Sequence, residues 1–157
     1  MTNLNFNVAV TGVPGTGKTT LCEALRTKGF KTLDLNKFAM DQGCLENDEV
    51  LIECLMEKID FEGYILDGHY SHLLGCYCAI VTECEENVLV NRLRLRGYSK
   101  EKIEENIDCL KSDCIWNEAK DLLPYRRILR LNSEKKDSLN TALSFIERMR
   151  LNFNGTR

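Results

Sequence analysis

The chain has 157 residues, with 21 basic and 24 acidic side chains and a formal net charge of −3. Its length fits one folded domain, and its composition is that of an ordinary globular protein. The charge balance lacks the basic excess that tight, sequence-independent nucleic-acid binding requires. We also expect no direct sequence-specific nucleic-acid binding.

No stretch of the chain approaches the roughly 18 apolar residues of a membrane span. Residues 1–7 lack the basic start and apolar core of a signal peptide. We therefore expect no membrane partner and a cytoplasmic protein, also nuclear if the cell is eukaryotic. The chain contains eight cysteines, none in a Cys-x-x-Cys pair. Without an export signal, we expect free thiols, several acting as small buried hydrophobic residues.

Short apolar runs alternate along the chain with longer segments of helical spacing. The expected strands are residues 5–11, 31–33, 64–67, 77–82 and 127–131. The expected helices are residues 18–28, 36–42, 48–59, 87–95, 100–120 and 135–150. We expect Ser99 to cap the helix that follows it, with Lys102 at the third position. We expect the polar end after residue 151 to fray.

This alternation predicts an α/β three-layer sandwich, with a central parallel sheet of about five strands and helices on both faces. We expect residues 1–157 to form a single domain. Ligands of such folds bind at the carboxyl ends of the strands, so those ends are where functional residues are sought.

Residues 12–19 read Gly-Val-Pro-Gly-Thr-Gly-Lys-Thr and match the phosphate-loop pattern G-x-x-x-x-G-K-[ST] at every fixed position. Gly12, Gly15 and Gly17 allow backbone angles that other residues resist, and they let backbone N–H groups close around phosphates. The loop follows an expected strand and opens an expected helix, whose N-terminal partial charge favours an anion. The pattern therefore predicts binding of ATP or GTP.

The polar side chains of this loop have separate predicted roles. Lys18 is expected to reach the β and γ phosphates, and the Thr19 hydroxyl is expected to bind Mg²⁺. Thr20 is expected to add a contact to the α phosphate, and Thr16 belongs to the same nucleotide-binding segment.

Asp67 directly follows an expected buried strand, which suits a residue that holds Mg²⁺ directly or through a water. The alternative is an ordinary turn aspartate before Gly68, and we favour the metal role. His69 either positions a water and tunes the metal's surroundings or is a loop histidine without chemistry. Both interpretations of His69 stay open, and for His72 we favour a structural role.

Arginines cluster at the end of the helix expected over residues 87–95. Arg92 and Arg96 are four residues apart and share one helix face. Guanidinium groups suit phosphate oxygens and stabilise charge in phosphoryl transfer, although many such clusters are solvated basic faces. Downstream of a phosphate loop, we interpret Arg92 and Arg96 as catalytic lid arginines, with Gly97 letting the lid move.

The motifs together resemble one family. The resemblance rests on residues 12–20, Asp-Gly-His at 67–69 and the arginine-rich segment 92–98 that ends in Arg-Gly-Tyr. Asn-Ile-x-Cys at 106–109 and Trp-x-Glu-Ala at 116–119 add to it. These segments span nearly the whole chain, which resembles the adenylate kinase isoenzyme six family.

The resemblance implies a P-loop NTPase fold of the nucleoside monophosphate kinase type. It implies a monophosphate-binding region near residues 34–59 and a mobile lid near residues 95–106. It further implies adenylate kinase activity with ATP and Mg²⁺, ATPase activity, and a role in small ribosomal subunit and rRNA maturation through a small-subunit ribosomal protein partner.

The resemblance also carries roles to single residues. Asp67 and His69 correspond to the family's Walker B-like pair, and Arg96 corresponds to a lid arginine that contacts ATP. Lys135 corresponds to a residue near the adenine, although a solvated loop lysine is an equally good interpretation of this position.

The chain departs from the family in the monophosphate-binding region. A longer insert of the family is reduced here to residues 42–48, and Asn36-Lys37 replaces Gly-Asp. No arginine lies between Arg26 and Arg92, although ordinary adenylate kinases bind the AMP phosphate with arginines from this region. Lys37 could replace one of them only as a point charge.

Several functions remain open on these grounds. The first is a nucleoside monophosphate kinase that converts ATP and AMP to two ADP, mainly by positioning and charge neutralisation. The second is an ATPase assembly factor with little AMP kinase activity. The third is a P-loop kinase for another small-molecule acceptor, and the fourth is a non-catalytic nucleotide sensor.

Overall fold

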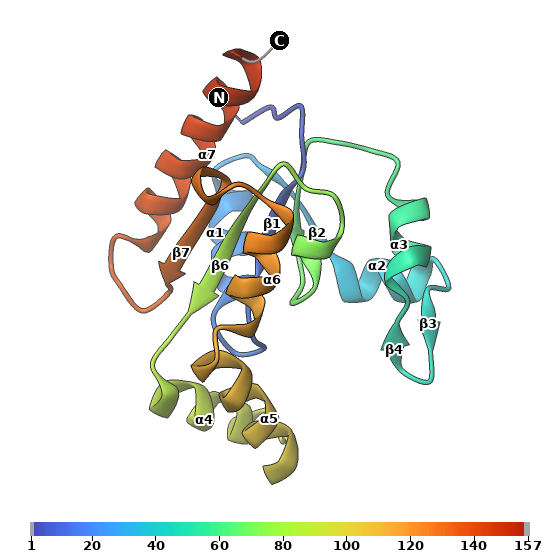
Figure 1. The fold of residues 1–157 in the computed structure, drawn as a ribbon, viewed down its shortest axis with the longest axis vertical. Coiled ribbons are helices and arrows are strands. Elements are labelled where there is room, and N and C mark those ends of the chain that lie inside the picture. Colours follow the sequence, from blue (N-terminus) through green and yellow to red (C-terminus); the bar gives the residue numbers. More distant parts are fainter. Residues whose placement is uncertain (1, 156–157) are drawn as a thin grey trace.

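The computed structural model describes residues 2–155, which form an α/β sandwich around a parallel five-stranded sheet (Figure 1). The strand order is β2-β5-β1-β6-β7. The strands are β1 (Val8–Thr11), β2 (Lys31–Asp34), β5 (Tyr64–Asp67), β6 (Cys78–Glu83) and β7 (Ile128–Asn132). The prediction of a parallel α/β sheet with about five strands is therefore confirmed.

The central strand β1 is buried on both faces because its side chains alternate between two hydrophobic clusters. Val8 and Val10 pack against α1 (Lys18–Thr27) and α7 (Ser138–Gly155). Ala9, on the opposite face, packs with Leu35 and Tyr70. Helices thus cover both faces of the sheet.

The remaining elements extend from the carboxyl end of the sheet (Figure 1). One arm contains α2 (Leu35–Asp41), β3 (Leu45–Glu46), β4 (Glu49–Val50) and α3 (Ile52–Lys58). A helical extension contains α4 (Glu86–Leu95) and α5 (Lys100–Lys111), and α6 (Cys114–Leu122) leads back to the sheet. Two short 3₁₀ turns, η1 (Ser71–Leu73) and η2 (Tyr125–Arg127), complete the described residues.

The prediction of a helix over residues 48–59 is wrong for its first turn. Residues 45–50 form a two-stranded hairpin instead, and helix begins only at Ile52. Asn47 and Asp48 both have positive φ, at 52° and 63°. Asn and Asp tolerate this left-handed conformation, which a two-residue hairpin turn requires and a helix excludes.

The single helix expected over residues 100–120 is also wrong, because the chain breaks between α5 and α6. Asp113 takes a left-handed φ of 55°, which interrupts the helix directly before α6. The predicted cap before α5 is confirmed: Ser99 Oγ accepts from the Lys102 N–H at 3.2 Å.

The expectation that the chain frays after residue 151 is wrong for residues 152–155, because α7 continues to Gly155, while residues 156–157 lie outside the described residues. The Phe153 ring packs 5.1 Å from the Phe6 ring and 5.0 Å from the Tyr77 ring, measured between centroids. Burial of aromatic surface therefore offsets the polar composition of this end. Within the described residues, no helix combines the length and apolar character needed to cross a membrane.

The expectation of free thiols is wrong for four cysteines. Cys44 is bonded to Cys54, and Cys109 is bonded to Cys114. The hairpin brings the end of α2 against α3, and the left-handed turn at Asp113 brings the start of α6 against the end of α5, so the paired Cα atoms lie 5.5 and 5.2 Å apart. The other four cysteines are buried free thiols, namely Cys22, Cys76, Cys78 and Cys84.

Candidate active site

The phosphate loop lies between β1 and α1, where the sequence places it. Gly12 has a φ of 144°, and a Cβ atom there would lie 2.4 Å from Thr82 Oγ1 and 2.7 Å from the Thr82 carbonyl oxygen. Only glycine fits this position, because β6 passes directly beside the loop. The loop turn is closed by the Thr16 N–H, which donates to the Val13 carbonyl at 3.2 Å.

The Lys18 side chain folds back over the loop. Its Nζ donates to the Gly12 carbonyl at 2.8 Å and to the Val13 carbonyl at 3.1 Å. Burial of the ammonium group lowers the pKa of Lys18 to about 8, with Asp67 opposing the shift and Arg96 adding to it. A buried cation held by two loop carbonyls is well placed for phosphate oxygens.

Thr19 and Asp67 face each other across the start of α1. Because β5 pairs with β1, with Asp67 opposite Val10, the carboxylate ends beside the loop. Thr19 Oγ1 donates to Asp67 Oδ2 at 3.2 Å. Burial raises the pKa of Asp67, against the opposing effects of Lys18 and the Thr19 hydrogen bond. A hydroxyl and a carboxylate are ligands that Mg²⁺ prefers, so this donor set fits the predicted magnesium role.

A first cavity of about 240 Å³ opens in front of these residues. Its walls include the predicted residues Lys18, Thr19, Asp67, His69 and Arg96, with Asp34, Asn36 and Tyr98 opposite the loop. We call this space the phosphate cavity. Burial lowers the pKa of His69, helped by Lys18 and His72, and its ring packs on Tyr70.

The far wall of the phosphate cavity contains groups that the sequence did not reveal. The Tyr70 hydroxyl donates to Asn36 Oδ1 at 2.9 Å, and Asp34 Oδ1 accepts the N–H groups of Asn36 and Lys37. Asn36 is thus held by its side chain and its backbone, whereas Lys37 is exposed and is not among the cavity-lining residues. Burial raises the pKa of Tyr70 to about 12, so the phenol stays a donor.

A second cavity of about 240 Å³ lies on the other side of the loop. We call it the base cavity, because its walls are mostly apolar or weakly polar. They come from α1, α4, β7 and the start of α7, with the residues Gly15, Gly17, Thr20, Leu21, Ala24, Arg92, Arg96, Leu131, Ser133, Ser138 and Leu139. A nucleotide with its phosphates on the loop could place its base here.

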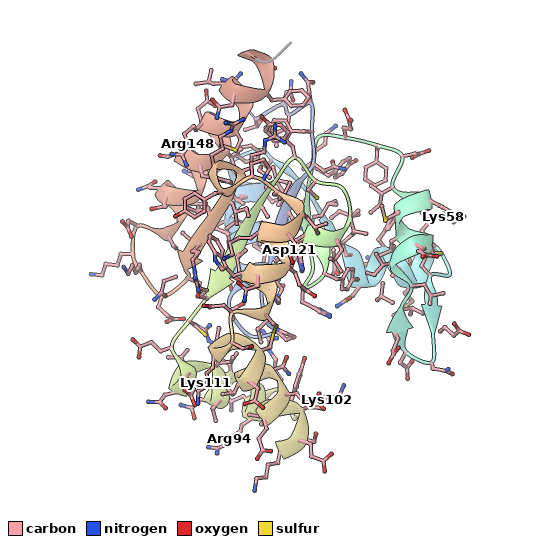
Figure 2. The ribbon with its side chains drawn as sticks, in the orientation of Figure 1. Lys58, Arg94, Lys102, Lys111, Asp121 and Arg148 are labelled. Atoms are coloured by element: carbon pink, nitrogen blue, oxygen red, sulfur yellow. A yellow bond between two sulfur atoms is a disulfide. The ribbon has the colours of Figure 1, made fainter. Side chains whose placement is uncertain are left out.

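The two predicted lid arginines have different surroundings. Arg96 lines both cavities and is exposed. Arg92 Nη1 donates to the Gly15 carbonyl at 2.9 Å, and Nη2 pairs with Glu134. Arg94, between them in the sequence, is exposed and lines neither cavity (Figure 2). Lys135 is exposed and lies outside the walls of both cavities, so its role beside the adenine stays a prediction.

Comparison with known proteins decides the family. The model of the "AAA domain" family matches residues 8–113. A protein of Thermoplasma acidophilum described as "Putative adenylate kinase" is 41% identical over 145 residues, or 90% of this chain and 95% of that protein. A protein of Thermoplasma volcanium with the same description is 43% identical over 147 residues, or 91% and 95%. The chain belongs to this family of adenylate kinase-like P-loop proteins.

Solved structures share the fold of this adenylate kinase-like family at low identity. Shikimate kinase from Acinetobacter baumannii in complex with shikimate is 14% identical over 94% of each chain, with a TM-score of 0.67. Deoxyadenosine kinase from M. mycoides is 13% identical over 90% of this chain and 99% of that one, with a TM-score of 0.59. Both agree with the P-loop α/β fold found here.

Proposed function

We propose that the protein is an ATP-dependent nucleoside monophosphate kinase that converts ATP and AMP to two ADP. The observation that carries the proposal is the convergence of Lys18, Thr19 and Asp67 on one cavity, which continues past the loop to Asn36. A donor nucleotide fits on the loop side, and an acceptor fits on the Asn36 side.

The reaction breaks the bond from the γ phosphorus to the bridging oxygen of ATP and forms a bond to an acceptor phosphate oxygen. Lys18 supplies positive charge at the β and γ phosphates, and Arg96 lies at the junction of the two cavities to stabilise the group in transit. Mg²⁺, held by Thr19 and Asp67, would neutralise phosphate charge. Because phosphoryl transfer depends mainly on positioning, no strong base is required.

The acceptor side is less cationic than the donor side. Apart from Lys18 and Arg96, the walls of the phosphate cavity contain no lysine or arginine among residues 2–155, while Asp34 lines the far wall. A phosphate dianion would therefore rely on Asn36 donors and the lid, which favours modest affinity for AMP.

This weak acceptor wall supports ATPase activity as part of the proposal. The His69 ring lines the phosphate cavity beside Asp67 and can orient a water toward the transferred phosphoryl group. The resemblance to the isoenzyme six family extends the proposal to a role in small ribosomal subunit maturation, with a small-subunit ribosomal protein as partner.

A second candidate acceptor is a hydroxyl-bearing small molecule. Asp34 and Asn36 offer one hydrogen-bond acceptor and one donor on the same wall, a combination that suits a hydroxyl group better than a dianion. A screen of nucleoside monophosphates and polyhydroxylated compounds, with Mg-ATP as donor, separates these acceptors.

The decisive experiment is product analysis with Mg-ATP, with and without AMP, for the wild type and Lys18→Ala. Two ADP formed per AMP consumed, and lost in Lys18→Ala, is the expected result. Phosphate release from ATP with AMP untouched would instead favour the ATPase assembly factor. Turnover that survives Lys18→Ala would contradict the phosphate-loop assignment.

A further inference from the structure

A hydrogen-bonded chain of three side chains, two of them buried, lies behind the phosphate loop. His72 Nε2 lies 2.9 Å from Glu118 Oε1, and His72 Nδ1 lies 2.7 Å from Thr11 Oγ1. Thr11 is fully buried and His72 is 3% exposed, while Glu118 reaches the surface of α6. None of the three lines the phosphate cavity or the base cavity.

The chemistry of the three groups assigns a direction to the chain. A carboxylate only accepts, so the Nε2 hydrogen of His72 points to Glu118. In the neutral ring Nδ1 then carries no hydrogen, so it accepts from the Thr11 hydroxyl at 2.7 Å. Glu118 thus selects the ring tautomer, and the tautomer selects the orientation of the Thr11 hydroxyl.

Thr11 connects this hydrogen-bonded chain to the phosphate loop. It is the last residue of β1 and directly precedes Gly12, whose carbonyl accepts from Lys18 Nζ. The Thr11 carbonyl lies 3.1 Å from Thr82 Oγ1, which lies 2.7 Å from Thr16 Oγ1 inside the loop.

The network also ties the loop to the helical extension. Helix α6 packs on α5 and on η1, so Glu118 connects the extension to the strand that carries the loop. A second hydrogen bond fixes η1 to β1, since Ser71 Oγ donates to the Val10 carbonyl at 3.0 Å.

We propose that His72, oriented by Glu118, is a positioning residue that holds the phosphate loop in its nucleotide-binding conformation through Thr11. The inference rests on the proposed function only in that the loop binds Mg-ATP. It assigns a role in nucleotide affinity to a histidine for which the sequence favours a structural role alone.

The test measures the dissociation constant for Mg-ATP by titration calorimetry, at a temperature where circular dichroism shows every variant folded. A lost hydrogen bond is worth up to about tenfold in affinity, so Thr11→Val and His72→Phe should weaken binding about tenfold. Glu118→Ala should weaken it about threefold, since one bond of the network remains. Glu118→Gln keeps an acceptor for Nε2 and should bind like the wild type.

Asp121→Ala is the matched control, because Asp121 is an exposed acid on the same helix (Figure 2). It should leave the dissociation constant unchanged. The kcat at saturating ATP should stay near the wild-type value in Thr11→Val, so that only the KM for ATP moves. Lower melting temperatures with unchanged dissociation constants for Thr11→Val and Glu118→Ala would overturn the proposal and leave a purely structural network.

The outcomes separate this inference from the proposed function. If the wild type binds Mg-ATP but does not consume AMP, the kinase proposal fails, and the binding series still decides the role of His72. If the wild type converts AMP and the variants bind ATP normally, the inference alone fails. If the wild type does not bind Mg-ATP, both fail.

Discussion

Thr19 and Asp67, separated by 48 positions in the sequence, are joined by a hydrogen bond of 3.2 Å from Oγ1 to Oδ2. The contact exists because β5 pairs with β1 and ends level with the loop. The first turn of α1 and the end of β5 thus bring together the two side chains predicted to bind Mg²⁺, at the carboxyl edge of the parallel sheet.

Replacing Asp67 by asparagine tests this pair. Asp67→Asn keeps an acceptor for Thr19 but removes the charge, so we expect ATP turnover to fall by about 100-fold or more with little loss of stability. EDTA should abolish turnover of the wild type. Asp121→Asn, an exposed acid on α6, is the matched control and should retain full activity. Unchanged turnover and magnesium dependence in Asp67→Asn would rule out the metal role.

The pKa of Lys18 predicts a pH dependence of stability. Its folded-state pKa is about 8, against 10.5 for an ordinary lysine. Between these values the unfolded chain holds a proton that the folded protein has lost, so the free energy of unfolding rises with pH. Relative to Lys18→Met, the wild type should gain up to about 3 kcal/mol between pH 8 and pH 10.5. Urea denaturation at several pH values measures the difference, and parallel curves for the two proteins would contradict the prediction.

Binding of nucleotide phosphates should raise the lowered pKa of Lys18, because an anion beside the ammonium group favours its protonated form. Binding of nucleotide near pH 9 should therefore take up a proton. Calorimetry in two buffers of different ionisation enthalpy detects this uptake, and Lys18→Met should show none. An equal, non-zero uptake in both proteins would assign the proton to another group.

Asn36 is predicted to carry the acceptor contact. Asn36→Asp removes the amide donors and adds a charge, so the KM for AMP should rise about tenfold or more. ATP hydrolysis without AMP should change little, because the loop side is untouched. Tyr70→Phe should also raise the KM for AMP, but by less, because it removes the 2.9 Å hydrogen bond that holds the Asn36 amide in place. Lys37→Ala alters the exposed neighbouring residue and serves as the control. If the KM for AMP rises only in Lys37→Ala, then Lys37 rather than Asn36 contacts the acceptor.

Two glycines with positive φ offer a matched stability test. A Cβ atom at Gly12 would meet Thr82 Oγ1 at 2.4 Å, whereas one at Gly97 would meet nothing within 4 Å. Gly97→Ala should therefore cost about 1 kcal/mol, from backbone strain alone. Gly12→Ala should cost about 2 kcal/mol more because β6 must shift. Chemical denaturation measures both, and equal costs would show that the contact with Thr82 relaxes freely.

Local pattern was sufficient to predict the five strands of the central sheet and the phosphate loop. Residues 64–67 form the strand that their apolar run predicts, and the glycine pattern of residues 12–19 lies between a strand and a helix. The predicted residues Lys18, Thr19, Asp67, His69 and Arg96 all line one cavity. Their chemical roles remain predictions that the experiments above test.

Local pattern failed to predict the two turns at which polar residues take a left-handed backbone conformation. Asn47-Asp48 and Asp113 turn with positive φ, and neither position carries a glycine that would signal this. These turns bring Cys44 to Cys54 and Cys109 to Cys114. Because the sequence analysis missed both turns, it also wrongly predicted that these four cysteines are free thiols.

The sequence by itself determined the class of fold and the donor side of the site, because a phosphate loop is a contiguous segment whose spacing encodes its geometry. Only the tertiary structure decided the acceptor wall and the Glu118–His72–Thr11 chain, because those groups come from separate elements. Hydrogen bonds between residues 46 and 61 positions apart leave no periodic signal in a sequence. They form only after packing of the hydrophobic core has placed η1 and α6 beside β1.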